Sequence, residues 1–195
     1  RPDDAVLGEE GTDRAGSTGL TWVVDPLDGT TNFLYRYPQW AVSVCCEDGD
    51  GQLVGCVHDP NRGETFSALG GGGAALDGVP IHVSTLGELD RALVGTGFNY
   101  DRAVRAGQAA ALGTVLPAVR DVRRGGSAAL DLAWTACGRL DGFWEAGLQR
   151  WDWAAGVLLV REAGGVVTAG PTAHGPVGHV AAGLALAEAL AALVG

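Results

Sequence analysis

The sequence predicts an α+β protein, with an antiparallel sheet in its first half and alternating strands and helices in its second half. Short apolar runs separated by the turn sequences "GDG" and "PNRG" recur before residue 100, which is typical of an antiparallel meander. From about residue 107, helical stretches alternate with short strand-like runs, which is typical of βα units. With 195 residues and 47% hydrophobic residues, the chain can bury a sizeable core.

The first half, residues 1–106, is expected to form mostly strands. Its first 19 residues are polar and turn-rich around a short apolar "AVL", and a short helix is expected over 30–36, where Pro38 prevents its continuation. The expected strands cover 20–25, 40–48, 52–59, 64–70, 80–84 and 92–98.

The second half, residues 107–195, is expected to contain four helices and four short strands. The helices cover 108–119, 127–138, 151–163 and 184–193, and the strands cover 121–123, 142–145, 165–168 and 178–182. Four consecutive glycines at 70–73 suggest a phosphate-binding loop, but no Lys-Ser/Thr pair and no long helix follow them. We therefore expect a hairpin connection there.

The charge balance restricts the function. The net charge is −10, with 23 acidic residues against 13 basic ones, all of which are Arg, so a basic nucleic-acid surface is not expected. A phosphorylated substrate remains compatible if cations lie between acids and phosphate. Four cysteines without CxxC spacing indicate buried thiols of a cytoplasmic protein. No apolar run reaches the ~20 residues of a membrane span, so no membrane partner is expected.

The stretch "WVVDPLDGTTNF" carries the chemistry. Asp25 ends a predicted strand, and Asp28 follows three residues later. Two carboxylates this close repel each other unless a cation lies between them. Mg²⁺ prefers oxygen ligands, and the backbone carbonyl of Leu27 can complete such a ligand set. The alternative is that Asp28 caps a helix and Asp25 is a turn residue.

The residues that follow suit an anion. Gly29 permits a tight turn, and the amides of Gly29, Thr30 and Thr31 are expected at a helix N-terminus, which favours phosphate. One short segment therefore offers both a candidate metal-binding site and a candidate phosphate-binding site.

Three motifs together resemble the inositol monophosphatase family of Mg²⁺-dependent, lithium-sensitive phosphatases. They are "LGEEG", "WVVDPLDGTTNFLYRYPQWAVSV" and "WDWAAGVLLVREAGG", in the family's order. The resemblance implies the layered αβαβα sandwich of the inositol monophosphatase and fructose-1,6-bisphosphatase type. Family chains begin about two helices before "GEE", and nothing here matches that region. The chain therefore resembles an N-terminally truncated bacterial member that lacks the first helices, with an exposed apolar sheet face and weak or absent activity.

The resemblance also implies roles for individual residues. The implied metal ligands are Glu9, Asp25, Asp28 and Asp152, with the carbonyl of Leu27. The implied catalytic residues are Thr30, Asp25 and Asp28. The implied substrate contacts are Gly29, Thr30, Thr31, Gly126, Ser127, Ala128, Glu145 and Asp152. Taken alone, Glu9 is a solvated acid, Asp152 a helix N-terminal acid and Glu145 a strand-end surface acid.

The implied reaction is Mg²⁺-dependent hydrolysis of a small phosphate monoester by metal-activated water, with myo-inositol 1-phosphate as the favoured substrate. Two or three Mg²⁺ ions are implied, with Mn²⁺ as an alternative and Li⁺ as an inhibitor, in a homodimer. Histidinol phosphate, fructose 1,6-bisphosphate and adenosine 3′,5′-bisphosphate are alternative substrates. Thr31 favours the inositol type, because the histidinol type more often carries Lys there. A non-catalytic metal-binding, phosphate-binding or regulatory protein is the alternative from another class.

Overall fold

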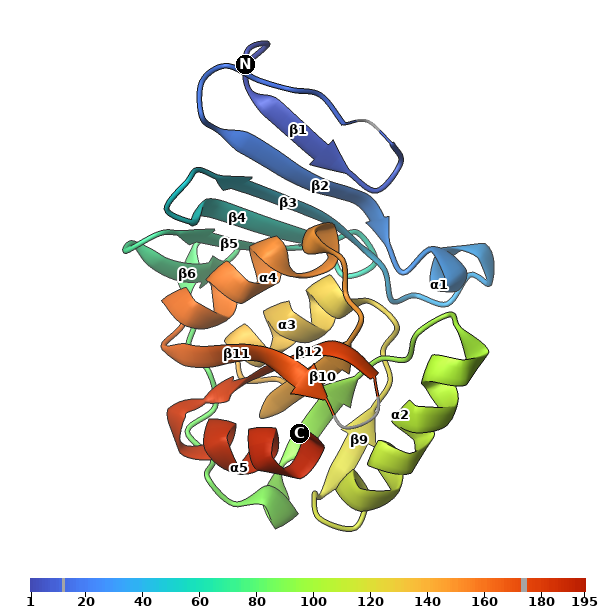
Figure 1. Ribbon diagram of the computed structural model, residues 1–195. Coiled ribbons are helices and arrows are strands. Elements are labelled where there is room, and N and C mark those ends of the chain that lie inside the picture. The colour runs from blue at the N-terminus through green and yellow to red at the C-terminus, as the bar shows by residue number, and fades with distance from the viewer. Residues whose placement is uncertain (12, 173–174) are drawn as a thin grey trace.

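Two sheets and the helices around them form four stacked layers. The computed structural model describes residues 1–11, 13–172 and 175–195, and the side chains outside 171–177. Helices α3 (Ala128–Ala136) and α4 (Arg150–Glu162) lie between the sheets, whereas α2 (Arg102–Val115) and α5 (Leu184–Val194) lie beyond the second sheet (Figure 1). Within the described ranges, no helix covers the outward face of the first sheet. This arrangement confirms the layered α+β sandwich.

The first sheet has seven strands in chain order, from β1 to β7. Strand β1 runs parallel to β2, and every later pair is antiparallel, which confirms the expected meander. The strands are β1 (Ala5–Gly8), β2 (Thr21–Asp28), β3 (Ala41–Glu47), β4 (Gln52–Asp59), β5 (Glu64–Leu69), β6 (Gly73–Leu76) and β7 (Val79–Pro80).

The second sheet has five strands in the order β11-β12-β10-β8-β9. Its strands are β8 (Leu93–Thr96), β9 (Asp121–Arg123), β10 (Gly142–Ala146), β11 (Gly165–Thr172) and β12 (Gly175–Gly183). Strands β9, β8 and β10 are parallel, and β12 joins antiparallel to β10 and β11. The change of sheet falls between β7 and β8, and the division of the chain at residue 106 stays a prediction.

Several elements differ from the sequence expectations. The turn-rich N-terminus contains β1, which is stabilised by pairing with the edge of β2. Helix α2 starts at Arg102 and not at 108, because the Asp101 side chain accepts hydrogen bonds from the amides of Ala103 and Val104. The strand expected over 80–84 is reduced to Val79–Pro80.

The remaining helical elements are short: α1 (Thr30–Leu34) and the 3₁₀ turn η1 (Leu89–Arg91). The longest helix, α2, has 14 residues. In the part of the chain that the structure describes, no helix has the length and apolar character needed to cross a membrane.

The glycine run at 70–73 lies in the hairpin that joins β5 to β6, as expected. The amides of Gly71 and Gly73 donate to the two carboxylate oxygens of Glu162, at 2.8 and 2.9 Å. Because Glu162 is the last residue of α4, the hairpin is attached to the end of that helix.

The layer between the sheets forms the core and depends on close approach of α3 and α4. Phe66, Phe143, Leu130 and Leu159 are fully buried there. A Cβ atom at Gly156 of α4 would lie only 2.5 Å from the Cβ of Leu132 in α3. The absence of a side chain therefore sets the spacing of the two helices, whose N-terminal ends reach the same side of the molecule (Figure 1).

We expect Gly156→Ala to lower the free energy of unfolding by about 1–3 kcal/mol, because the added methyl group overpacks the contact with Leu132. Thermal unfolding followed by circular dichroism measures the change. Gly113→Ala in α2 is the matched control, because nothing lies within 4 Å of the added methyl group. Gly113→Ala is expected to raise the free energy of unfolding by about 0.5–1 kcal/mol. Equal effects of the two variants would contradict this account of the helix spacing.

Candidate metal centre and substrate cleft

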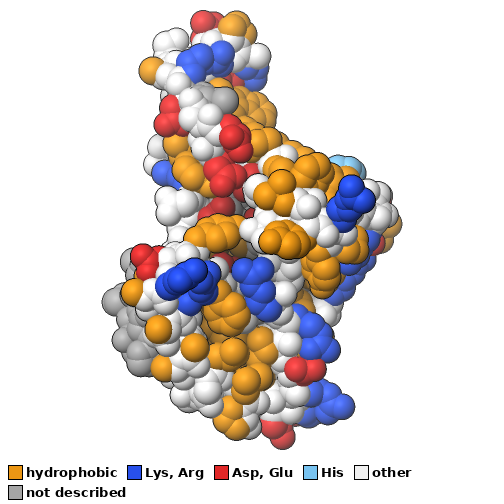
Figure 2. All heavy atoms as spheres, turned by 90° about the vertical axis from the view of Figure 1, so that its right-hand side faces the viewer, with side chains coloured by type: hydrophobic (Ala, Val, Ile, Leu, Met, Phe, Trp, Pro, Cys, Tyr) orange, Lys and Arg blue, Asp and Glu red, His pale blue; other side chains and the backbone are white. Residues whose placement is uncertain are grey.

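A polar cleft of about 280 Å³ lies where β2, α3, α4 and the segment after β8 meet. Figure 2 shows acidic side chains gathered in the hollow between the N-terminal strands and the lower half of the molecule. The residues that line the cleft include five acids and a single basic residue of the described chain: Glu9, Asp25, Asp28, Glu145, Asp152 and Arg124. Such a cleft favours cations on its acidic wall.

Three aspartates form a compact cluster in this cleft. Asp25, Asp28 and Asp152 each offer a carboxylate oxygen within 4.8 Å of the others. Residues three apart in a regular strand point to opposite faces. The pairing of β2 with β3 shifts register between Asp25 and Asp28, so the irregularity around Pro26 brings both side chains to one site.

Each of these carboxylates has one oxygen held by a donor of the protein. The hydrogen bonds run from Leu27 N to Asp25 Oδ1 (2.8 Å), from Ser127 Oγ (2.5 Å) and Ala129 N (2.8 Å) to Asp28 Oδ2, and from Gln149 N to Asp152 Oδ2 (2.6 Å). Among the described residues, no hydrogen bond engages the second oxygen of any of the three. The cluster therefore presents three oriented and unengaged oxygens.

The acidity of the cluster reflects its burial and crowding. Burial, and then repulsion from Asp28, raise the pKa of Asp25 to about 8. Burial likewise raises the pKa of Asp28 to about 6 and that of Asp152 to about 7. A divalent cation would remove this penalty, because it stabilises the ionised carboxylates. The all-oxygen donor set fits Mg²⁺.

The alternative interpretation of Asp28 as the cap of its own helix is wrong. The N-cap of α1 is Gly29, and no side chain caps that helix. Asp28 instead accepts hydrogen bonds from Ser127 and Ala129 at the start of α3, 99 and 101 residues away. The side chain therefore ties β2 to α3.

Two further residues expected at the metal centre lie beside the cluster. Glu9 lines the cleft and raises the pKa of all three aspartates, although its carboxylate is outside the compact set. The carbonyl of Leu27 accepts a hydrogen bond from Thr30 Oγ at 3.0 Å. This bond orients the Thr30 hydroxyl at the edge of the cluster.

The residues expected to contact substrate divide into two groups. Those that line the cleft are Gly29, Thr30, Gly126, Ala128, Glu145 and Asp152. Ser127 and Thr31 do not line it: Ser127 lies beneath and holds Asp28, whereas the Thr31 hydroxyl lies 3.4 Å from that of Tyr100. A Cβ at Gly29 would come within 3.0 Å of the Gln39 carbonyl, so glycine is needed for the close approach there.

Sequence reasoning missed two charged residues next to Glu145. Arg124 lines the cleft, and its positive charge lowers the pKa of Glu145 and of Asp131. Burial nevertheless raises the pKa of Glu145 to about 8. Asp131 lies in α3, is 2% exposed, and has its pKa raised by burial and by Glu145. Neither residue belongs to a recognisable spacing pattern, because Asp131 of α3 and Arg124, which directly follows β9, approach Glu145 of β10 only in the folded chain.

Comparison with known proteins identifies a family and relatives that this chain resembles. The family model described as the inositol monophosphatase family matches residues 1–194. The inositol-1-monophosphatase of Mycobacterium leprae is 46% identical over 205 residues, covering 98% of this chain and 70% of that protein. The Nus factor SuhB of Salmonella typhimurium LT2 is 45% identical over 173 residues, covering 86% of this chain and 63% of that protein.

A solved structure agrees with the fold. The extragenic suppressor protein suhB from Bartonella henselae superimposes with a TM-score of 0.92 and 37% sequence identity. The superposition covers 99% of this chain and 76% of that protein. This chain therefore spans 59% to 70% of the length of the curated relatives and 73% to 80% of the length of the solved structures that it matches.

The raised pKa values make the stability of the metal-free protein depend on pH. The pKa of Asp25 is about 8 in the folded state and ~3.9 in an unfolded chain, so the unfolded state loses its proton first as pH rises. The free energy of unfolding is therefore expected to fall between about pH 4 and pH 8. Mg²⁺ is expected to raise the Tm, and to raise it more at pH 8 than at pH 5. Scanning calorimetry with Mg²⁺ and with a chelator measures both effects.

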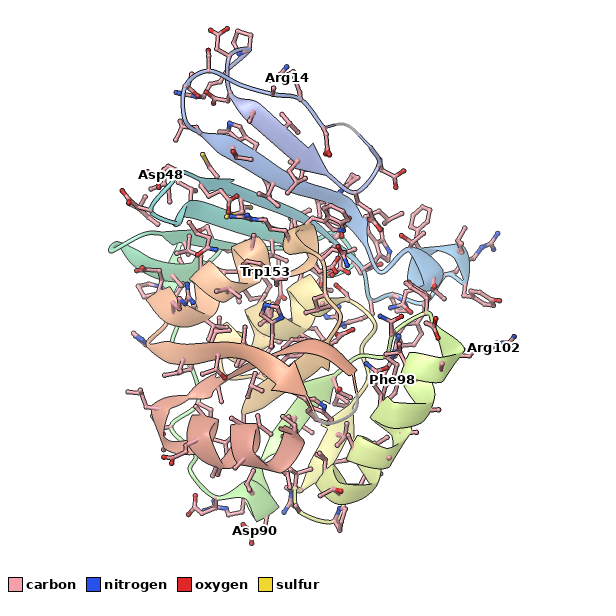
Figure 3. All side chains as sticks on the ribbon, in the orientation of Figure 1. Arg14, Asp48, Asp90, Phe98, Arg102 and Trp153 are labelled. Carbon is pink, nitrogen blue, oxygen red and sulfur yellow. The ribbon has the colours of Figure 1, made fainter. Side chains whose placement is uncertain are left out.

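Asp25→Asn tests whether the cluster causes this behaviour. The variant removes one buried charge, so it is expected to raise the Tm of the metal-free protein at pH 8 and to diminish the shift caused by Mg²⁺. Asp90→Asn is the control, because Asp90 is exposed and lies at the far end of the molecule (Figure 3). An undiminished Mg²⁺ shift in Asp25→Asn would exclude the three-aspartate cluster as the metal site.

Proposed function

We propose that this chain, which belongs to the inositol monophosphatase family, hydrolyses a small phosphate monoester in the acidic cleft. The observation that carries the proposal is the cluster of three aspartates, each with one oxygen engaged and one unengaged, beside a cavity of substrate size. Because the family is Mg²⁺-dependent and the donor set is all oxygen, Mg²⁺ is the proposed cofactor, as two or three ions.

The proposed ligands are Asp25, Asp28, Asp152 and Glu9, with the carbonyl of Leu27. When bound, Mg²⁺ neutralises phosphate oxygens and lowers the pKa of water. The hydrogen bonds on the engaged oxygens orient the aspartates, and this orientation reduces the reorganisation needed for ligation.

Thr30 is proposed to orient the attacking water. Its hydroxyl donates to the Leu27 carbonyl at 3.0 Å, so its oxygen lone pairs remain to accept a hydrogen bond from that water. The amides at Gly29 and Thr30 and the start of α3 from Gly126 to Ala128 are proposed to hold the phosphate and the leaving group.

The favoured substrate is myo-inositol 1-phosphate. Glu145 lines the cleft on the side away from the N-terminal strands, and in the described chain no hydrogen bond engages its carboxyl group. It is therefore available to bind the hydroxyl groups of a polyol. Relatives named inositol-1-monophosphatase support this choice. Histidinol phosphate, fructose 1,6-bisphosphate and adenosine 3′,5′-bisphosphate are the alternatives within the superfamily.

A second candidate is a regulatory or non-catalytic role, which relatives named Nus factor SuhB favour. The net charge of −10 argues against direct binding of nucleic acid and leaves a protein partner as the alternative. A homodimer, a cytoplasmic location, use of Mn²⁺ and inhibition by Li⁺ stay predictions.

Phosphate release from the four substrates, measured with and without Mg²⁺ and then with Li⁺, distinguishes the two candidates. The phosphatase proposal expects release from inositol 1-phosphate that requires Mg²⁺ and is inhibited by Li⁺. Binding of Mg²⁺, measured by calorimetry, without release from any of the four substrates would favour the regulatory role.

Asp25→Asn is expected to lower kcat by orders of magnitude and to leave the far-UV circular dichroism spectrum unchanged, because it removes a ligand without removing core volume. Asp90→Asn is expected to retain the turnover of the unmodified chain. Near-normal turnover of Asp25→Asn would refute the proposed site.

A further inference from the structure

The carboxyl group of Glu145 occupies a space that exists only because residue 97 is glycine. A Cβ atom built on Gly97 would overlap the carboxyl carbon and both carboxyl oxygens of Glu145. Gly97 is buried, and it directly follows β8, whose last residue Thr96 pairs with Trp144 of β10. Gly97 and Glu145 therefore lie side by side where two parallel strands end, and the Glu145 side chain lies across its neighbour's backbone.

Space, and not backbone conformation, is the reason for glycine at this position. The backbone of Gly97 is not in the left-handed region, unlike that of Gly29 (φ 92°) or Gly126 (φ 90°). Any residue could adopt the backbone conformation of residue 97. A side chain there would have to take the place of the Glu145 carboxyl group.

We propose that Gly97 is a positioning residue that sets the specificity of the cleft, because it provides the space in which Glu145 presents its carboxyl group to the hydroxyl groups of the leaving alcohol. This inference rests on the proposed phosphatase function. It assigns the selectivity for polyhydroxylated leaving groups to a pair of residues from adjacent strands, Gly97 and Glu145.

A displaced Glu145 has few places to go. Asp131 lies close enough for the charge of Glu145 to raise its pKa, and Asp28 raises the pKa of Glu145 in the same way. When these carboxyl groups are ionised, movement of Glu145 toward either acid is opposed by repulsion. The remaining direction is the cleft itself, where Arg124 is the basic residue of the lining, and a carboxyl group there would obstruct the leaving alcohol.

The fold itself should tolerate a methyl group at residue 97. All three of the nearest atoms belong to the end of a long side chain, whereas at Gly156 they belong to the packed base and body of Leu132. The side chain of Glu145 can rotate away without moving the backbone. Gly97→Ala is therefore expected to fold and to differ from the unmodified protein in the position of Glu145.

The test compares Gly97→Ala, Glu145→Ala and the double variant in a double-mutant cycle. Two substrates are used with Mg²⁺: myo-inositol 1-phosphate, and 4-nitrophenyl phosphate, whose leaving group carries no further hydroxyl. Above pH 8, where the Glu145 carboxyl group is ionised, Gly97→Ala is expected to lower the ratio of kcat/KM for the first substrate to that for the second by about 10- to 100-fold, the range for lost hydrogen bonds to a charged group. In the Glu145→Ala background the same substitution is expected to change this ratio less than about twofold, within the range of additivity.

Gly49→Ala is the matched control, because nothing lies within 4 Å of the added methyl group and Gly49 is exposed in a turn. An unchanged ratio of the two kcat/KM values in Gly97→Ala would overturn the inference. An equal fall of this ratio with Glu145 present and with Glu145→Ala would also overturn it. Absence of Mg²⁺-dependent turnover in the unmodified protein would refute the proposed function instead. In that case crystal structures of the unmodified protein and Gly97→Ala decide the inference, which fails if the Glu145 carboxyl group keeps its position.

Discussion

The crowding of three carboxyl groups, two of them buried and one half-buried, is the constraint on which the rest of this structure depends. Asp25, Asp28 and Asp152 come from the end of β2 and the start of α4, and their oxygens lie within 4.8 Å of one another. Without a cation, partial protonation and hydrogen bonds from amides and one hydroxyl group stabilise this arrangement. The irregular end of β2, the close packing of α3 on α4 and the start of α3 all hold these side chains together.

The sequence predicted the parts of the site that are local. Asp25 and Asp28 stand in one short motif, and Asp152 opens a helix with clear periodicity, so their chemistry could be inferred before their geometry was known. The meander was predictable for the same reason, because each hairpin is closed by its own turn residues. Strand β1 was not, since its stability comes from pairing with β2 and not from its own four residues.

The missed features all arise from contacts between distant segments. Asp131 of α3 and Arg124, which directly follows β9, influence Glu145 only because the fold brings these segments close to β10. The space at Gly97 is equally invisible in the sequence, where that residue is one glycine among 32. Local sequence patterns indicate secondary-structure propensity and the chemistry of each residue. They do not indicate which side chain the fold packs into the space beside a glycine.

The attachment of Glu162 to the glycine hairpin bears on how α4 can move. Helix α4 is fixed at its first residue by the ion pair of Arg150 with Glu47 of β3, at 2.8 Å, and at its last residue by the hydrogen bonds that Glu162 accepts from the amides of Gly71 and Gly73. A rod about 20 Å long that is anchored at both ends cannot slide along its axis without breaking one anchor. An ion that binds at the cleft would then be exchanged by rotation of side chains about their own bonds, while helix α4 stays in place.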